Sequence, residues 1–267
     1  MRIAYEYNHL NAKEYLLVNK DAQLTELQNS ITTLDANQYL KISLDKAKFG
    51  IVIYNQGQIN SAIQSYLRAR HWQESKVYYY VTSDETTTRE IVNILDKEQQ
   101  KQVIESRGYM SHSTYNQVDF QKDRIAVEVQ FGKYFSVAYD LHVKHTFFFS
   151  RNDIDVGVEV IPTKAMEEHM DTGVPWFENE VTNVIREGRT NPPVPILILG
   201  IEPDEIASKE PTDYSDEALI EILKTIDIPK YRNQRDKILN SELTTDRMAV
   251  YMRRIEKIDH CLAMMRE

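Results

Sequence analysis

The sequence lacks three features, and each absence excludes a class of protein. Its 267 residues include a single cysteine, Cys261, so no internal disulfide can form and a reducing compartment is expected. No run of about 18 or more apolar residues occurs, which excludes a membrane-spanning helix. Residues 1–7 have no apolar core of the kind that a signal peptide needs. We therefore expect a cytoplasmic protein without a membrane partner.

Internal repeats, glycine-rich phosphate-binding loops and zinc-ligand spacings are also absent from the sequence, which disfavours repeat arrays, P-loop enzymes and zinc modules. What is present is the balance of an ordinary globular protein, with 42% hydrophobic and 27% charged residues. A chain of 267 residues is long enough for one sizeable core with an appendage, or for two small domains.

The net charge of −9 argues at first against a nucleic-acid partner, because DNA binding depends on lysine and arginine neutralising phosphates. The charge is unevenly distributed, however. Residues 202–221 hold eight acidic residues against one lysine, a local net charge of −7, so the other residues sum to −2. A nearly neutral core can carry a basic cleft, and acidic metal ligands would be offset by their cation.

The spacing of apolar residues predicts strands that alternate with helices along the chain. Strands are expected at 1–8, 49–54, 76–82, 118–120, 125–131, 154–160 and 195–201. Helices are expected at 21–35, 59–70, 86–108, 135–149, 166–170, 177–188, 216–226 and 243–267. This alternation predicts an α/β protein with a mixed central β-sheet flanked by helices.

An acidic, proline-containing stretch at 202–215 indicates a linker. We therefore expect two units, a core at 1–203 and, at 204–267, an acidic linker with a helical C-terminal extension. The last helix is amphipathic, and two interpretations of it stay open. It packs on the core, or it pairs with a second subunit or clamps DNA through four cations, Arg247, Arg253, Arg254 and Lys257.

The most informative stretch is a predicted hairpin at 117–133. Apolar residues at 125, 127, 129 and 131 occupy one face of its second strand, and Glu128 and Gln130 occupy the other. A polar turn at 121–124 would bring Asp119 alongside Glu128. Two carboxylates and an amide that converge in this way suit Mg²⁺, which takes a few hard oxygen ligands and leaves positions for water and phosphate. The alternative is a solvated strand face without a metal.

Asp119 followed by Glu128-x-Gln130 on adjacent strands resembles the site pattern of the PD-(D/E)xK nuclease superfamily, with Gln130 where a lysine usually stands. The wider sequence resembles Type II restriction endonucleases of the BstYI and BglII group, in which glutamine replaces that lysine. The resemblance covers roughly residues 1–203 and is strongest for the BstYI type. It is carried by residues 78–82, 115–134, 137–145, 154–159 and 183–189.

This resemblance implies a restriction-endonuclease-like core with Asp119, Glu128 and Gln130 as catalytic residues. It further implies that Asp119, Glu128 and the backbone carbonyl of Val129 bind Mg²⁺, with Mn²⁺ as a substitute. Gln130 has no charge, so it would orient the attacking water through its carbonyl or contact the phosphate through its NH₂ group. We therefore expect strict metal dependence, with Ca²⁺ bound but not supporting efficient cleavage.

Two further residues are candidates for reading DNA. In the BstYI-like interpretation Lys133 reaches a base edge in the major groove, where contacts of lysine or arginine to guanine are the commonest specific ones. Thr172 falls where the family places a second base-reading segment. The alternatives are a solvated lysine and a turn hydroxyl. His142 and His145 could imitate a metal-binding pair, although partly buried packing residues are the simpler interpretation.

A palindromic site is read most simply by a twofold homodimer. The resemblance implies a double-stranded DNA substrate with a six-base-pair site, a central GATC and 5′ overhangs, and a cognate DNA methyltransferase that protects the host. The outer base pairs, degenerate or fixed, stay open. Two alternatives remain, a repair or structure-specific nuclease on the same core and a catalytically silent DNA-binding module; the intact Asp119, Glu128 and Gln130 speak against the second.

Overall fold

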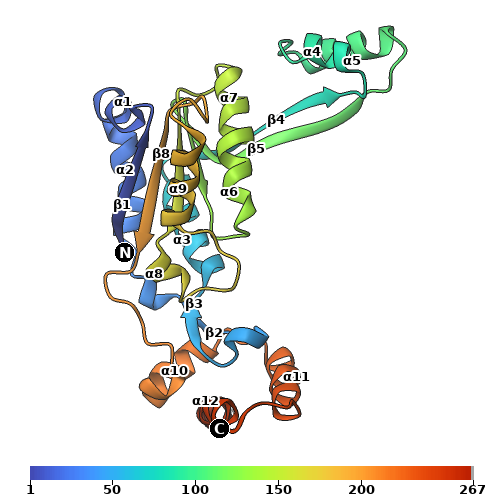
Figure 1. Ribbon diagram of the computed structural model, residues 1–267. Coiled ribbons are helices and arrows are strands. Elements are labelled where there is room, and N and C mark those ends of the chain that lie inside the picture. Colours follow the sequence, from blue (N-terminus) through green and yellow to red (C-terminus); the bar gives the residue numbers. More distant parts are fainter. Residues whose placement is uncertain (266–267) are drawn as a thin grey trace.

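A six-stranded mixed sheet forms the centre of the protein, whose computed structural model describes residues 1–265 (Figure 1). The strand order is β1-β8-β7-β6-β5-β4. Strands β6, β7 and β8 run parallel, and the remaining neighbours pair antiparallel. The strands are β1 Arg2–His9, β4 Gln73–Val81, β5 His112–Lys122, β6 Ile125–Val129, β7 Val156–Pro162 and β8 Ile196–Glu202.

Both faces of the central sheet are covered, which confirms the predicted α/β class. Strands β6, β7 and β8 are buried along their whole length, as expected for parallel strands between two helical layers. One face packs against α1, α2 and α3 and the other against α6, α7 and α9. The helices flanking the sheet are α1 Ala12–Asn19, α2 Asp21–Thr32, α3 Gln56–Arg68, α6 Phe135–Tyr139, α7 Thr146–Ser150, α8 Lys164–Glu167 and α9 Phe177–Glu187.

The helix expected at 135–149 is present, but its middle is not a regular α-helix. Residues Asp140–His145 form a π-helical segment between α6 and α7. Such segments are rare and occur frequently at functional sites. Ile125, Val127 and Val129 pack into the hydrophobic cluster on the side of α1, α2 and α3. Glu128, at the alternate position, therefore points to the opposite face of the sheet. The π-helical segment packs against that face.

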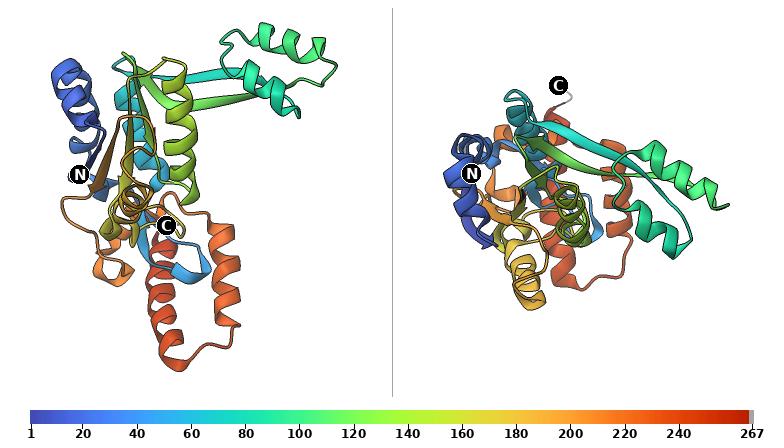
Figure 2. Two further views of the ribbon diagram at one scale, coloured as in Figure 1. Left: turned by 45° about the horizontal axis from the view of Figure 1, so that its top comes forward. Right: turned by 90° about the horizontal axis from the view of Figure 1, so that it is seen from above.

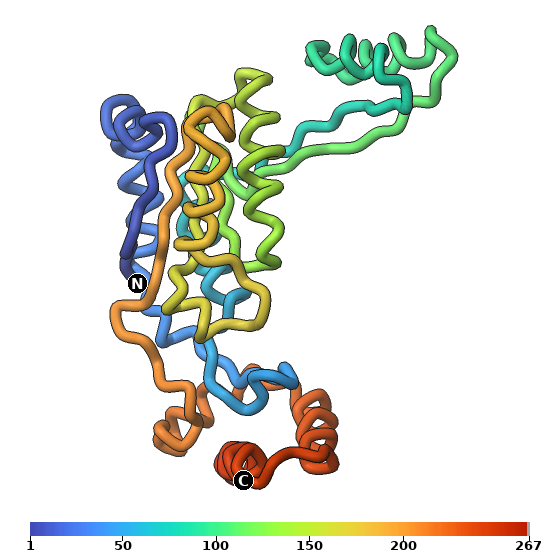
Figure 3. Tube along the Cα trace, in the orientation of Figure 1, coloured from blue at the N-terminus to red at the C-terminus, as the bar shows by residue number. Residues whose placement is uncertain are grey.

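Strands β4 and β5 continue beyond the sheet as an arm (Figures 1 and 2). The chain leaves the core along β4, forms α4 Glu85–Ile91 and α5 Lys97–Ser106, and returns along β5 (Figure 3). The single helix expected at 86–108 is wrong. Asp84 and Asp96 each accept a backbone N–H as an N-cap, from Thr87 and Gln99 respectively, and the second cap starts a new helix.

The C-terminal helices pack on a small two-stranded sheet rather than forming a free tail. This sheet pairs β2 Leu40–Ile42 with β3 Val52–Tyr54. Phe49 and Val52 share a hydrophobic cluster with Tyr231 and Ile258. The helices are α10 Asp216–Leu223, α11 Ile228–Leu239 and α12 Thr245–Met264, and the short 3₁₀ helices of the chain are Ala36–Gln38, Lys46–Lys48 and Pro211–Asp213.

Helix α11 was not expected, whereas α10 and α12 were. The last two residues of the expected C-terminal helix lie outside the described residues. Helix α12 packs through its apolar face, which includes Ile255 and Ile258. Two of its four cations form ion pairs with the acidic stretch, Arg254 with Glu210 and Lys257 with Asp216. Among residues 1–265, no helix is long and apolar enough to span a membrane.

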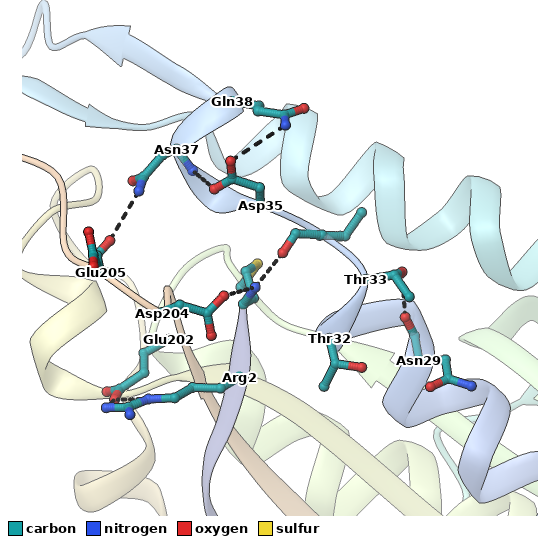
Figure 4. A network of polar contacts seen from close by, with 12 residues as sticks. Arg2, Asn29, Thr32, Thr33, Asp35, Asn37, Gln38, Glu202, Asp204 and Glu205 are labelled. Atoms are coloured by element: carbon teal, nitrogen blue, oxygen red, sulfur yellow. Dashed lines mark hydrogen bonds and ion pairs between the residues drawn. The ribbon is translucent and has the colours of Figure 1, made fainter.

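A polar network fastens the start of the acidic stretch to the N-terminal part of the chain (Figure 4). Arg2 pairs with Glu202 at 2.6 Å, and the N-terminal ammonium pairs with Asp204 at 2.9 Å. Asn37 donates to the carbonyl of Glu205 at 3.2 Å. The division at 203/204 stays a prediction, and these contacts show that the chain is held on the core at that point.

Candidate active site

The hairpin that brings the candidate residues together has a two-residue turn. Phe120 pairs with Val127, and pairing continues to the end of β5 at Lys122. Asp123 and Arg124 then turn the chain with φ of 47° and 68°. Positive φ at both central residues is the turn geometry that matches the twist of a hairpin. The four-residue turn expected at 121–124 is therefore wrong by two residues, because β5 extends further.

Asp119 and Glu128 converge where this hairpin opens. Phe120 and Val127 form its last registered pair, and the register continued by one residue places Asp119 opposite Glu128. Beyond that pair, the N–H of Val129 donates to the carboxylate of Asp119 at 3.2 Å instead of to a backbone carbonyl of β5. The Glu128 side chain is buried. Burial, reinforced by the negative charges of Asp119 and Asp140, raises the pKa of Glu128 well above its usual value.

Asp140 and Lys144, which were not among the predicted site residues, complete this cluster from the π-helical segment. The ammonium of Lys144 lies 3.0 Å from Oε1 of Glu128 and 2.7 Å from Oδ1 of Asp140. Burial lowers the pKa of Lys144, but the two carboxylates outweigh it and the net shift is upward. Burial raises the pKa of Asp140. The sequence held two weak signals: both residues fall within the stretch 137–145 that carries the resemblance, and they stand four apart on an expected helix.

Gln130 lies directly after β6 and both ends of its amide are engaged. Its Nε2 donates to Oδ2 of Asp140 at 2.9 Å, and its Oε1 accepts the N–H of Gly132 at 3.0 Å. A Cβ at position 132 would lie 2.7 Å from that oxygen, so a larger residue there would push the Gln130 amide out of this position. The second amide hydrogen and the second lone pair are left for a water or a phosphate. Either expected role of Gln130 stays a prediction.

The two histidines of the helix do not form a metal-binding pair. His142 faces Glu187, with Nε2 at 2.9 Å from Oε2, whereas His145 is fully buried against Glu159 at 3.0 Å. Burial and the neighbouring Lys144 lower the pKa of His145 to about 3, and burial raises the pKa of Glu159 well above its usual value. His145 is therefore a neutral packing residue beneath the carboxylate cluster.

The chemistry of this cluster suits a divalent cation bound by few protein ligands. Within residues 1–265 no three histidine, cysteine, aspartate or glutamate side chains form a ready-made metal cluster. Mg²⁺ does not require one, because it keeps several waters and binds through one or two carboxylates together with substrate phosphates. Asp119 and Glu128 would provide these carboxylates. The backbone of Val129 faces them, since its N–H donates to Asp119.

The two candidate DNA-reading residues lie on loops that are joined to each other. The N–H of Tyr134 donates to the carbonyl of Gly173 at 2.8 Å. This bond ties the loop of Lys133, which leads from β6 into α6, to the loop of Thr172. Both side chains belong to exposed residues. The hydroxyl of Thr172 lies 3.5 Å from a carboxylate oxygen of Asp45. Their contact with DNA stays a prediction.

A mixed sheet with two acidic side chains converging at an opened hairpin defines a nuclease core of the restriction-endonuclease kind. The chain belongs to the BglII/BglIII family of restriction endonucleases, whose family model matches residues 4–201. It is thus a Type II restriction endonuclease, a DNA-cleaving hydrolase. Residues 202–267 lie beyond the match.

One solved structure agrees with this fold, and a second one is reported beside it. The crystal structure of restriction endonuclease BglII complexed with a DNA 16-mer is similar with a TM-score of 0.52 and 16% sequence identity, and the alignment covers 77% of this chain and 81% of that chain. The crystal structure of free BglII gives a TM-score of 0.47 and 15% identity, covering 77% and 82%. No curated protein matches the chain.

Proposed function

We propose that the protein is a homodimeric, Mg²⁺-dependent endonuclease that hydrolyses phosphodiester bonds in double-stranded DNA at a short palindrome. The observation that carries the proposal is the opening of the β5–β6 hairpin, where Asp119 lies opposite Glu128 and takes over the hydrogen bond of Val129. Two carboxylates that meet in this way suit Mg²⁺, which binds through one or two carboxylates together with substrate phosphates.

In this proposal Asp119, Glu128 and the carbonyl of Val129 would hold the metal. A bound Mg²⁺ supplies Lewis-acid polarisation of the phosphate and lowers the pKa of a coordinated water. The protein contributes the position of the ligands and of Gln130. Because Asp140 and the N–H of Gly132 hold the amide of Gln130 at both ends, its free lone pair and hydrogen have a defined direction. Mn²⁺ would replace Mg²⁺, and Ca²⁺ would bind without efficient cleavage.

For the substrate, we propose a six-base-pair palindrome with a central GATC, cut to leave 5′ overhangs, as in the BstYI type. BglII has been solved with a DNA 16-mer. In this chain Lys133 and Thr172 are exposed on two loops joined by the Tyr134–Gly173 bond, so they could enter one groove together. A palindrome is matched by two copies of one chain, and a cognate methyltransferase would protect the host DNA.

Digestion of one plasmid tests this function. Wild-type protein is incubated with Mg²⁺, with Mn²⁺, with Ca²⁺ and with EDTA, beside Asp119→Asn and a matched control, Glu85→Gln on the exposed arm. We expect discrete bands in Mg²⁺ and Mn²⁺ only, and none from Asp119→Asn. A smear or nicks would instead indicate a repair or structure-specific nuclease, and intact plasmid throughout would indicate a silent DNA-binding module. Sequencing the fragment ends supplies the recognition site, and sedimentation supplies the oligomeric state.

A further inference from the structure

The candidate metal site already contains one fixed cation, the ammonium of Lys144. Among the ion pairs of residues 1–265, Lys144 is the one cation that pairs with Glu128 or Asp140. Its side chain is 21% exposed, while those of Glu128 and Asp140 are 2% and 1% exposed. The ammonium is thus the most exposed member of this ion-paired trio, and an ion that binds Glu128 must share that carboxylate with it.

The π-helical segment brings this ammonium to a place where β6 and the residue that follows it supply no cation. Gln130 occupies the position at which the superfamily pattern has a lysine, and it is neutral. Asp140 joins the two residues, because its Oδ2 accepts from Gln130 at 2.9 Å and its Oδ1 lies 2.7 Å from Lys144. The charge missing from the strand is thus present in the same cluster, supplied by the π-helical segment.

Formal charge gives Lys144 a defined effect on metal binding. In the ionised state that metal binding requires, Asp119, Glu128 and Asp140 carry three negative charges, and Lys144 reduces them to a net −2, which one divalent cation balances. An ammonium in contact with Glu128 also repels an approaching metal ion, and the repulsion is strong in a partly buried site where water screens it little.

We propose that Lys144 is a positioning residue that acts through Glu128: it takes the place of the lysine absent at position 130, holds the carboxylate in place for cleavage, and weakens the binding of a divalent cation to the DNA-free protein. The inference rests on the proposed function, because it concerns the same site. Its distinctive consequence is that removing the charge changes metal affinity and cleavage in opposite directions. A purely structural lysine would lower both.

The test is a calorimetric titration of DNA-free protein with Mn²⁺, accompanied by plasmid cleavage in Mg²⁺. Lys144→Met keeps the apolar stem and removes the charge. We expect Mn²⁺ to bind about three- to tenfold more tightly and cleavage to slow by at least about tenfold, the scale seen when groups behind metal ligands are removed. In Gln130→Lys/Lys144→Met, which returns a cation from the strand, both quantities should move back toward wild type.

Lys122→Met is the matched control. Lys122 is 19% exposed and its ammonium lies 2.7 Å from Glu26 and 2.8 Å from the carbonyl of Arg70, so it is a similarly buried ion-paired lysine. It extends from the face of β5 opposite to Asp119, and its loss should leave Mn²⁺ affinity unchanged. If Lys144→Met does not fold, Lys144→Gln is titrated in its place with the same expectation.

The outcomes separate this inference from the function on which it rests. If the wild type neither binds Mn²⁺ nor cleaves DNA in Mg²⁺, the proposed function fails and the inference fails with it. If the wild type cleaves but the neutral variants bind Mn²⁺ no more tightly than it does, the role of Lys144 is overturned and the function stands. Tighter Mn²⁺ binding with slower cleavage supports both.

Discussion

The two ends of strand β5 belong to one continuous strand and have opposite surroundings. At the arm end, the Tyr115 ring lies 5.6 Å from that of Tyr78 on β4, and both side chains are about half exposed. At the core end, Val118 and Phe120 are buried, and Asp119 between them faces Glu128. At the arm end the side chains of the strand are therefore exposed to water, whereas at the core end they are covered by helices.

This comparison shows that burial, rather than residue type, determines the protonation behaviour of an acidic side chain here. Glu85 on the arm pairs with Arg89, with both side chains more than three-quarters exposed, and such a pair contributes little to stability. Glu128 is buried among like charges, which raises its pKa. A cluster of this kind costs stability and is typical of sites retained for function.

The largest expected effect is on cleavage. Glu128→Gln should reduce plasmid cleavage by about a thousandfold or more, the scale of a lost electrostatic contribution at a reacting centre, whereas Glu85→Gln on the arm should cleave normally. Removing a buried carboxylate from among like charges should leave the thermal midpoint unchanged or raise it. Full cleavage by Glu128→Gln would show that the metal ligands lie elsewhere.

Removing the C-terminal helices should destabilise the core far more than removing the tip of the arm. Truncation after Pro203 uncovers Phe49 and Val52, which pack on α11 and α12, and each large apolar side chain that is uncovered costs roughly 1.5–3 kcal/mol. Replacing 83–110 by a short glycine-containing turn uncovers fewer buried residues. Urea denaturation measures both. Equal loss in the two variants would mean that the arm is as integral as the C-terminal unit.

Truncating aromatic side chains along β4–β5 sharpens the same contrast. Phe120→Ala should lower the free energy of unfolding by about 3–5 kcal/mol because it leaves a cavity in the core. Tyr115→Ala, on a half-exposed side chain, should lower it by less than about 1 kcal/mol. Chemical denaturation of both variants gives the difference, and a comparable loss at Tyr115 would contradict the view of the arm as a solvated extension.

Lys133→Ala should weaken binding to cognate DNA in Ca²⁺ by about 5- to 150-fold, the discrimination carried by one base contact, and should relax specificity at one base pair. Lys101→Ala, on the exposed arm helix α5, is the control with the same lost charge. Fluorescence anisotropy on cognate and altered duplexes measures both. If the two lysines behave alike, Lys133 contributes only general attraction to phosphate.

The smallest expected effect is a pH dependence of stability. Burial, Lys209 and Lys48 lower the pKa of His169 to about 4, against about 6.5 in the unfolded chain. Between these values the unfolded chain holds the additional proton, so this histidine makes stability fall as pH falls from 6.5 toward 4. His169→Gln should recover about 1 kcal/mol at pH 5, allowing for partial exposure. His112→Gln on the arm is the control in thermal melts at pH 7 and pH 5.

Much of the fold could be predicted because its signals are local. The continuous apolar run that forms β8 indicated a fully buried strand, and β8 is buried throughout. Helix α11 was not predicted because it lacks an apolar repeat at three- and four-residue spacing. Its buried residues, Tyr231 and Ile238, stand seven apart without other buried residues between them. The arm was hidden for a related reason: alternation in β4 indicates a strand but does not say whether another layer covers its faces.

The candidate site divides in the same way. Glu128 and Gln130 stand out because side-chain alternation is a property of two neighbouring residues, and the hairpin that returns Asp119 to them needs only a short turn. Asp140 and Lys144 did not stand out, because a π-helical segment forms only when packing against the sheet favours it over a regular helix.

The sequence by itself determined where the strands of the central sheet lie, which of their faces are apolar, and that Asp119 returns to Glu128, since each depends on residues close together in the chain. Only the tertiary structure decided that Lys144 and Asp140 meet Glu128, that the loops of Lys133 and Thr172 are joined, and that β2 and β3 hold the C-terminal helices. These contacts join distant segments, and their energies exist only once the helices have packed against the sheet.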